Sequence, residues 1–335
     1  MNFLEGIWDA IIQFFAIGEM IQIVKTGDYS SFLTIKGVLM VLRVSLPFLL
    51  FVEIFRNLVL RKFDLKHYKI PLLSYLFIAI LGRIIPLSFV VVLIGFFSKY
   101  KLFTIPITWY GFIIAYVVYE FANFVHHYFG HKVRLLWCLH SIHHSSETMN
   151  LAVAYNRFFL EQTYIDFVKI GLCIILGIQP PVLLAIFVVD EIWGLFIHIG
   201  EDFFPKGRIG ILETIIFSPS HHRVHHAKNP LYMDTNFCVT LNLWDRIFKT
   251  YQPIKDEIPV DYGITRPVNS TDFVDVTFGE IKSLYKDVSA APGIKNKLLY
   301  LIMPPGWSHD GEDKTASKMR NEFLKKLLVM RKNNI

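Results

Sequence analysis

Residues 102–131 read LFTIPITWYGFIIAYVVYEFANFVHHYFGH, an apolar run that ends in three histidines. The apolar part, 102–124, is longer than the roughly 20 residues a helix needs to span a hydrocarbon core. Three further apolar runs of sufficient length occur at 36–55, 70–98 and 159–199. The sequence therefore predicts an all-α integral membrane protein with about four to six membrane-embedded helices.

The composition supports this class. Of the 335 residues, 53% are hydrophobic and 19% are charged, whereas soluble proteins average about 25% charged residues. The net charge of +6 fits attraction to anionic lipid better than a nucleic-acid footprint, so no nucleic-acid partner is expected. Only three cysteines are present, without a CxxC pair, which argues against thiol or cysteine-rich zinc chemistry.

The order of apolar and charged segments predicts an organisation and an orientation. Five basic residues and one acid lie between the first two runs, which the positive-inside tendency places in the cytoplasm. Gly177, Pro180 and Pro181 interrupt the run 159–199, which predicts a kinked hairpin. The polar segments 126–158 and 200–335 then share the cytoplasmic side and form a histidine-rich cap.

Three regions follow from this organisation. Residues 1–104 are the N-terminal membrane helices, and residues 105–255 form the histidine-bearing domain. Residues 256–335 form a C-terminal cytoplasmic extension, in which Lys318 to Lys332 has the pattern of an amphipathic helix.

Histidine is the residue type that carries the functional signal. The chain has 13 histidines, and all but His67 and His309 lie between positions 126 and 226. Apart from the lone His198, they fall in three groups: His126, His127 and His131; His140, His143 and His144; His221, His222, His225 and His226. Such grouping is not expected of an incidental polar surface.

The spacing within each group suits metal binding. Residues four apart share a helix face and residues three apart nearly do, so His127 and His131 point into one site. The same holds for His140 with His143 or His144, and for His222 with His225 and His226. Neutral imidazole is a common ligand for iron, zinc, copper and nickel. The clustered imidazoles exceed what one tetrahedral ion needs, which favours two neighbouring ions.

Other metal chemistries fit less well. The zinc-protease pattern HExxH is absent, and no Glu-x-x-His of the carboxylate di-iron bundles occurs. Imidazoles therefore dominate the site. Zinc would suit hydrolysis, whereas iron activates dioxygen, the reagent needed to attack an unactivated C–H bond. A histidine-rich site beside a membrane thus favours lipid oxygenation over hydrolysis.

These motifs resemble the fatty acid hydroxylase and sterol desaturase superfamily of membrane di-iron enzymes. Its pattern of an acid, HxxxH and LW-x-x-HxxHH-S is similar to Glu120 through Ser145, and its later half to residues 218–226, SPSHHRVHH. Asn236 and the segment Trp244 to Thr250 extend the match. The resemblance covers roughly 105–255, so that region is expected to be the di-iron catalytic domain, most similar to the alkylglycerol monooxygenase-like branch.

The resemblance also implies site residues. Nine histidines take the ligand positions and would be both metal-binding and catalytic: His127, His131, His140, His143, His144, His198, His222, His225 and His226. Four residues are candidates for supporting contacts: His126, His221, Asp202 and Asn236. Asp202 is included because it follows His198 by four residues and would share its helix face. Tyr128, Val125, Glu120 and Lys249 depart from the usual family residues, but none removes a ligand.

The implied activity is an iron- and dioxygen-dependent monooxygenase that hydroxylates a long-chain, ether-lipid or sterol-like substrate. It requires two iron ions, dioxygen as co-substrate and an external electron donor, and whether it needs a pterin stays open. A lipid or sterol desaturase on the same site is the alternative within enzymes, and a non-catalytic membrane metal-binding or scaffold protein is the alternative outside them. The expected location is a bacterial inner membrane or the endoplasmic reticulum. The motifs identify neither the redox partner nor the oligomeric state.

Overall fold

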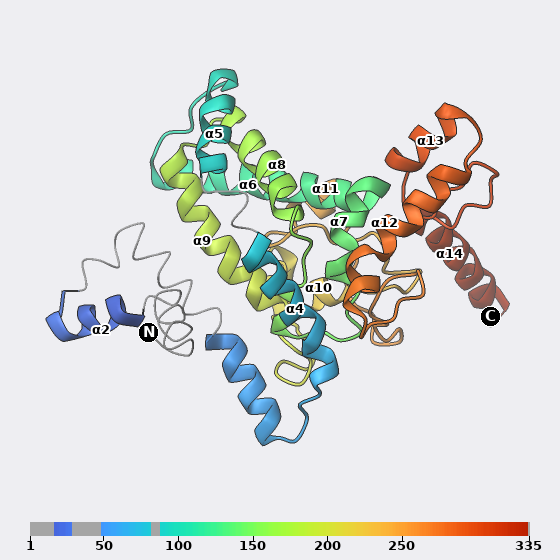
Figure 1. The fold of residues 1–335 in the computed structure, drawn as a ribbon, viewed down its shortest axis with the longest axis horizontal. Helices are drawn as coiled ribbons and strands as arrows, with labels where there is room; N and C mark the ends of the chain where they lie inside the picture. Colours follow the sequence, from blue (N-terminus) through green and yellow to red (C-terminus); the bar gives the residue numbers. More distant parts are fainter. Residues whose placement is uncertain (1–16, 29–47, 82–87, 334–335) are drawn as a thin grey trace. The chain divides into compact units, whose positions relative to one another are not determined.

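The computed structural model describes residues 17–28, 48–81 and 88–333 (Figure 1). Within these ranges the regular elements are helices, and the β-type pairings are two isolated bridges. The predicted all-α class is therefore confirmed for this part of the chain. The chain divides into two compact units, 1–63 and 64–335, which are described separately.

The first unit contains two described helical segments. Helix α2 spans Ile17–Thr26, and residues 48–59 are also helical. In the second segment the rings of Phe51 and Phe55 stack at 6.1 Å, as expected one helical turn apart. Most of the predicted apolar run 36–55 lies outside the described residues.

The second unit contains the remaining helices. Its α-helices are α4 (Leu65–Leu81), α5 (Ser88–Phe97), α6 (Trp109–Lys132), α7 (Arg134–His144), α8 (Glu161–Ile175), α9 (Pro180–Ile197), α10 (Pro219–His225), α11 (Leu243–Ile247), α12 (Phe273–Ala290), α13 (Gly293–Ile302) and α14 (Ala316–Asn333). Three 3-10 helices join them: η3 (Ser98–Tyr100), η4 (Leu151–Tyr155) and η5 (Gly210–Thr214). The run 70–98, expected as one crossing, contains α4 up to Leu81 and α5 from Ser88. Residues 82–87 between them lie outside the described part.

Helices α5, α6, α8 and α9 enclose an apolar core. Tyr119 of α6, Ile174 of α8 and Ile186 of α9 are fully buried in it. The break predicted within the run 159–199 is confirmed, because α8 ends at Ile175 and α9 begins at Pro180. The break contains Gly177 at φ +87°, where a Cβ would lie 2.6 Å from the carbonyl oxygen of Phe103. Only glycine fits this close approach.

One described helix, α9, is long and apolar enough by length and composition to cross a membrane. A shorter apolar helical stretch covers Phe89–Tyr100. The predicted number of four to six membrane-embedded helices and the predicted cytoplasmic orientation therefore remain predictions.

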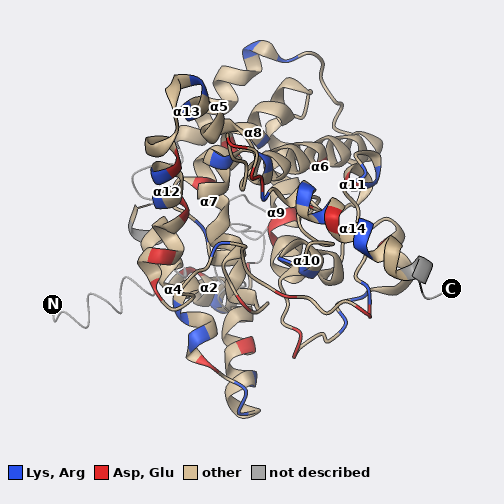
Figure 2. Ribbon diagram, turned by 90° about the vertical axis from the view of Figure 1, so that its right-hand side faces the viewer, with Lys and Arg blue, Asp and Glu red and all other residues tan. Residues whose placement is uncertain are grey.

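The C-terminal extension packs against the histidine-bearing region. Helix α12 contacts α7, α4 and α13, and Arg134 at the start of α7 donates to Ser283 Oγ at 3.1 Å. The amphipathic helix predicted from Lys318 to Lys332 is confirmed as part of α14. Figure 2 shows the contrast in charge: α6 is almost free of charged residues, whereas α14 carries several lysines and arginines.

Candidate metal centre

Helices α6 and α7 present the first two histidine groups. Thr108 caps the start of α6 by accepting a hydrogen bond from the backbone N–H of Gly111. Val133 adopts an extended conformation between Lys132 and Arg134, so α7 leaves in a new direction. The break at Val133 lets the histidines of α7 return toward those of α6.

A third short helix supplies the last group. Ser218 begins α10 with a capping box in which His221 takes part, and Pro219 occupies the first helical turn. Helix α10 contacts α9, which ends at Ile197 beside the lone His198. Residues from four separate stretches are thus brought to one region.

The imidazoles form two clusters in which the ligand nitrogens lie within 4.8 Å of one another. The five-histidine cluster contains His127, His131, His140, His144 and His225. The four-histidine cluster contains His143, His198, His222 and His226. The structure therefore brings together all nine histidines that the family resemblance implied as ligands.

Distances within the five-histidine cluster are short. The Nε2 atom of His140 lies 3.1 Å from Nε2 of His127 and 3.1 Å from Nε2 of His144. The rings of His127 and His225, from α6 and α10, have centroids 4.3 Å apart. Three helices therefore contribute to this cluster.

The four-histidine cluster is equally tight. His198 Nε2 lies 3.2 Å from His143 Nε2 and 2.9 Å from His222 Nε2. His226 Nε2 lies 3.0 Å from His222 Nε2. The two clusters are adjacent, because the rings of His144 and His226 stack at 4.3 Å.

In four of these nine histidines the Nδ1 atom is held by a backbone carbonyl. His127 Nδ1 lies 2.8 Å from the oxygen of Phe237, and His225 Nδ1 lies 2.9 Å from that of Thr235. The same contact joins His198 Nδ1 to the oxygen of Gly194 at 2.6 Å. A carbonyl only accepts, so Nδ1 carries the proton and Nε2 keeps its lone pair for a metal ion.

The donor set fits metal ions. Two nitrogens that bind one ion at about 2.1 Å along perpendicular directions are about 3.0 Å apart, which is the spacing found in both clusters. The Nε2 atoms of His131 and His225 are buried without a hydrogen-bond partner. Buried polar atoms normally have one, so a bound ion would satisfy these two. The nine imidazoles therefore form sites that suit two transition-metal ions.

Burial also favours the ligand form of the imidazoles. It is the largest cause that lowers the pKa of His143, His144, His222, His225 and His226 well below the ordinary value. Neighbouring imidazoles lower these pKa values further, because two protonated rings repel each other. The rings are therefore neutral near pH 7, the state in which imidazole binds metal.

Two carboxylates that the sequence analysis did not identify also hold cluster histidines. Glu161 Oε1 accepts from His140 Nδ1 at 2.6 Å. Asp234 Oδ1 lies 3.4 Å from His131 Nδ1, and its other oxygen pairs with Lys132. Neither acid lies in a histidine motif. The one sequence feature that could have pointed to Glu161 is its position as a charged residue near the start of the apolar run 159–199. No comparable feature marks Asp234.

The four candidate supporting residues lie outside the two clusters. His126 packs against the ring of Tyr164 at 6.5 Å. His221 Nδ1 accepts from the backbone N–H of Ser218 at 3.1 Å, and its Nε2 lies 2.9 Å from the Tyr251 hydroxyl. His221 therefore caps α10, the helix that carries the cluster histidines His222 and His225 and is followed directly by His226.

Asn236 and Asp202 also have different surroundings from those expected. The Asn236 amide donates to the carbonyl oxygens of His221 and Gln252, at 3.1 and 2.7 Å, and so joins α10 to the segment around Gln252. Asp202 is exposed in the turn after α9. Because α9 ends at Ile197, the four-residue spacing to His198 is not helical and the expected shared face does not form.

Two acids within the family motifs, Glu120 and Asp245, anchor the segment that follows the third histidine group. Glu120 Oε2 lies within hydrogen-bond reach of the backbone N–H groups of Val239, Thr240 and Leu241, at 3.1 to 3.4 Å. Asp245 accepts from the backbone N–H of Phe237 at 2.8 Å and of Cys238 at 2.9 Å. Both carboxylates fix the segment that contains the Phe237 carbonyl, which in turn holds His127.

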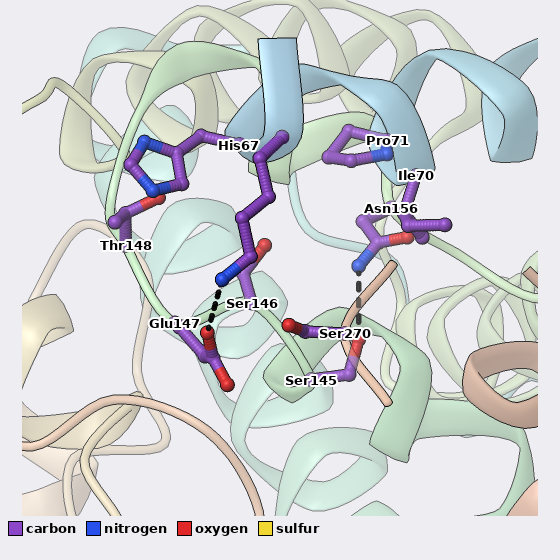
Figure 3. Close-up of a pocket in the computed structure, with 10 residues that line it drawn as sticks. His67, Ile70, Pro71, Ser145, Ser146, Glu147, Thr148, Asn156 and Ser270 are labelled. Carbon is purple, nitrogen blue, oxygen red and sulfur yellow. Dashed lines mark hydrogen bonds and ion pairs between the residues drawn. The ribbon is translucent and has the colours of Figure 1, made fainter. Parts of the chain in front are cut away.

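The loop after α7 is anchored in a small pocket beside α4 (Figure 3). Asn156 donates to the carbonyl oxygen of Ile142 at 2.6 Å and to Ser145 Oγ at 3.3 Å. Lys66 of α4 pairs with Glu147 at 3.6 Å. His67 lines this pocket and belongs to neither cluster.

Comparison with known proteins agrees with this arrangement. The family model for Fatty acid hydroxylase matches residues 112–250. Alkylglycerol monooxygenase from Xenopus tropicalis is 32% identical over 205 residues, which cover 60% of this chain and 43% of the relative. The human protein of the same name is 31% identical over 63% of this chain and 46% of the relative.

A bacterial relative has another named substrate. Ornithine lipid hydroxylase OlsE from Rhizobium tropici is 29% identical over 160 residues, which cover 47% of this chain and 46% of that protein. The chain thus spans less than half the length of these curated relatives. No solved structure gives a significant match. The resemblance drawn from the histidine motifs is confirmed to this extent: residues 112–250 match the Fatty acid hydroxylase family model, and the chain is similar to alkylglycerol monooxygenases over 60% or more of its length.

Proposed function

We propose that this chain is an iron- and dioxygen-dependent lipid monooxygenase in which the five-histidine and four-histidine clusters each hold one iron ion. The observation that carries the proposal is the convergence of nine imidazoles on two adjacent points, with ring nitrogens about 3 Å apart. The relatives named as lipid hydroxylases or monooxygenases support the same reaction class.

Iron supplies the redox chemistry of this reaction when it is bound, because it passes electrons from an external donor to dioxygen. One oxygen atom enters a C–H bond of the lipid, and the other leaves as water after taking two electrons from the donor and two protons. The protein's contribution is positioning. Carbonyl contacts at Nδ1 fix the ring orientation, and burial keeps the imidazoles neutral and limits access of water.

A substrate from the bilayer is supported by the surface of the apolar helices. Val91 and Val92 of α5 are 65% and 63% exposed, and Ile113 of α6 is 55% exposed. Contiguous exposed apolar side chains are typical of surfaces that contact lipid or partners. We therefore propose an integral membrane location with the clusters on the cytoplasmic side, and a long-chain, ether-lipid or sterol-like substrate.

Metal analysis and lipidomics together test the proposal. The purified full chain should contain about two iron ions, and with reductant and dioxygen it should convert one lipid class to products that carry one added oxygen atom. His143→Ala should abolish this product, whereas His67→Ala should retain it because His67 is outside both clusters.

The other outcomes separate the alternatives. A product that has lost two hydrogen atoms would identify a desaturase on the same site. Bound iron without oxygen consumption or lipid product would identify a metal-binding protein without turnover. A chain that binds no iron even after reconstitution would contradict the proposal. Adding a pterin to the same assay tests whether that cofactor is required.

A further inference from the structure

The two clusters differ in the groups that contact the Nδ1 atoms of their histidines. In the five-histidine cluster, His140 contacts the carboxylate of Glu161 at 2.6 Å and His131 lies 3.4 Å from that of Asp234. In the four-histidine cluster, His143 and His198 contact the carbonyl oxygens of Val153 and Gly194, at 3.2 and 2.6 Å. Among the described residues, no carboxylate contact is found for the four-histidine cluster, and His222 Nδ1 is buried without a partner.

This difference matters for metal affinity. A carboxylate that accepts from the second ring nitrogen increases the electron density of the imidazole and makes it a stronger ligand. A neutral carbonyl fixes the orientation but has a smaller effect, because it carries no full charge. The contact from Glu161 is the stronger of the two, because it is a short, charge-assisted hydrogen bond.

The surroundings of Glu161 strengthen the contact. Its side chain is only 4% exposed. Its Oε1 atom pairs with Nδ1 of His140 at 2.6 Å. The second oxygen, Oε2, is buried without a hydrogen-bond partner. A buried carboxylate with so few partners interacts strongly with the one it has, because little water screens the charge.

We propose that Glu161, with Asp234 in a secondary role, is a positioning residue that makes the five-histidine cluster the tighter of two unequal metal sites. This inference rests on the proposed function, because it requires that both clusters bind metal. The ion in the five-histidine cluster is then held more firmly and is released later than the ion in the four-histidine cluster.

A structural role for Glu161 predicts a different result. Glu161 is the first residue of α8, where a negative charge also interacts favourably with the helix N-terminus. Loss of that interaction would lower thermal stability without a selective effect on one metal site. The two roles are separated by measuring metal release and stability on the same variant.

The test uses the full-length protein loaded with iron-57 and measures iron release to a chelator, without turnover. The wild type should release iron in two phases of about one equivalent each. Glu161→Gln should weaken only the tighter site, by about 10- to 100-fold. Mössbauer spectra should show a change in one of two iron signals. Asp166→Asn, a carboxylate-to-amide change in the same helix away from the histidines, is the matched control.

Asp234→Asn provides a second variant in case Glu161→Gln does not fold. It should affect the same phase and the same iron signal, by a smaller factor. The proposal is overturned if Glu161→Gln releases iron as Asp166→Asn does. It is also overturned if iron release from the weaker site changes instead of release from the tighter site. A wild type that binds no iron would contradict the proposed function, whereas two unaltered phases in the variants would contradict this inference alone.

Discussion

His143 and His144 are adjacent in α7 but belong to different clusters. Their rings are 5.5 Å apart and nearly perpendicular, with an interplanar angle of 88°. His143 points to His198 of the four-histidine cluster, and His144 points to His140 of the five-histidine cluster. His225 and His226 divide in the same way. Two neighbouring positions on a helix are about 100° apart, which lets one helix serve two sites.

This division predicts the effect of removing single ligands. His143→Ala and His144→Ala should each lower the iron content from about two ions to about one, because each substitution removes a ligand from a different cluster. Elemental analysis and Mössbauer spectra of the two variants would check this, and the residual signals should differ. His309→Ala, outside both clusters, should retain the full content. Identical residual signals would argue against separate clusters.

The loop around Phe237 should be sensitive to Asp245. Asp245→Asn replaces one acceptor oxygen by an NH₂ group that faces a backbone N–H, so we expect a loss of about 1–3 kcal/mol in the free energy of unfolding. Asp256→Asn is the control, because the Asp256 side chain is 79% exposed. Thermal unfolding in detergent would measure both. Equal effects would show that Asp245 does not anchor the loop.

Arg223 is a buried residue between two ligands of α10. It is 1% exposed and donates to the carbonyl oxygens of Pro205 at 2.8 Å, Ile199 at 3.0 Å and Phe204 at 2.8 Å. Lysine cannot donate to all three carbonyl oxygens in this geometry, so Arg223→Lys should lower the free energy of unfolding by about 2 kcal/mol or more. Arg208→Lys, at a partly exposed ion pair, should cost less than about 1 kcal/mol. Chemical denaturation would distinguish the two, and equal costs would contradict the expectation.

Stability of the metal-free protein should fall in acid. Burial lowers the pKa of His221 from 6.5 to about 4, so the unfolded state binds more protons than the folded state between these values. The free energy of unfolding should therefore rise from pH 4 to about 6.5 and level off above. The buried cluster histidines act in the same direction.

Denaturation midpoints between pH 4.5 and 8, roughly the range over which histidine titrates, would test this. A His221→Gln variant should show a smaller slope, because one of the titrating groups is removed. Stability that increases as the pH falls would contradict the assignment of neutral, buried imidazoles.

Much of the helical framework is predictable from local sequence. The apolar run 102–124 from Trp109 onward and the histidines that follow it form one helix, α6, and Gly177 with Pro180 marks the turn between α8 and α9. The run 102–124 shows the limit of this approach. Apolar length alone does not reveal that α6 begins only at Trp109, because the apolar composition extends through residues 102–108, which are not helical.

The candidate site was predictable in the identity of the histidines but not in its supporting contacts. Glu161 is 21 residues from His140 in sequence, and Asp234 is 103 residues from His131. Such pairs depend on the packing of distant segments, which leaves no periodic signal in one sequence. The helical spacing expected between His198 and Asp202 is not formed, since it required α9 to continue past Ile197.

The sequence by itself determined the all-helical class, the resemblance to fatty acid hydroxylases over residues 112–250 and the histidines four residues apart that share a helix face. His127 with His131, His140 with His144, and His222 with His226 each fall in one cluster, because residues four apart point the same way on a helix. The pairs three apart divide between the clusters, so the prediction that His222 and His225 point into one site was wrong, and of the two alternatives for His140 the structure selects His144 rather than His143. Only the tertiary structure decided that His225 joins the α6 histidines and that His143 joins His198. That assignment depends on the directions in which α6, α7, α9 and α10 approach one another, and these directions are set by long-range packing and backbone hydrogen bonds rather than by local spacing.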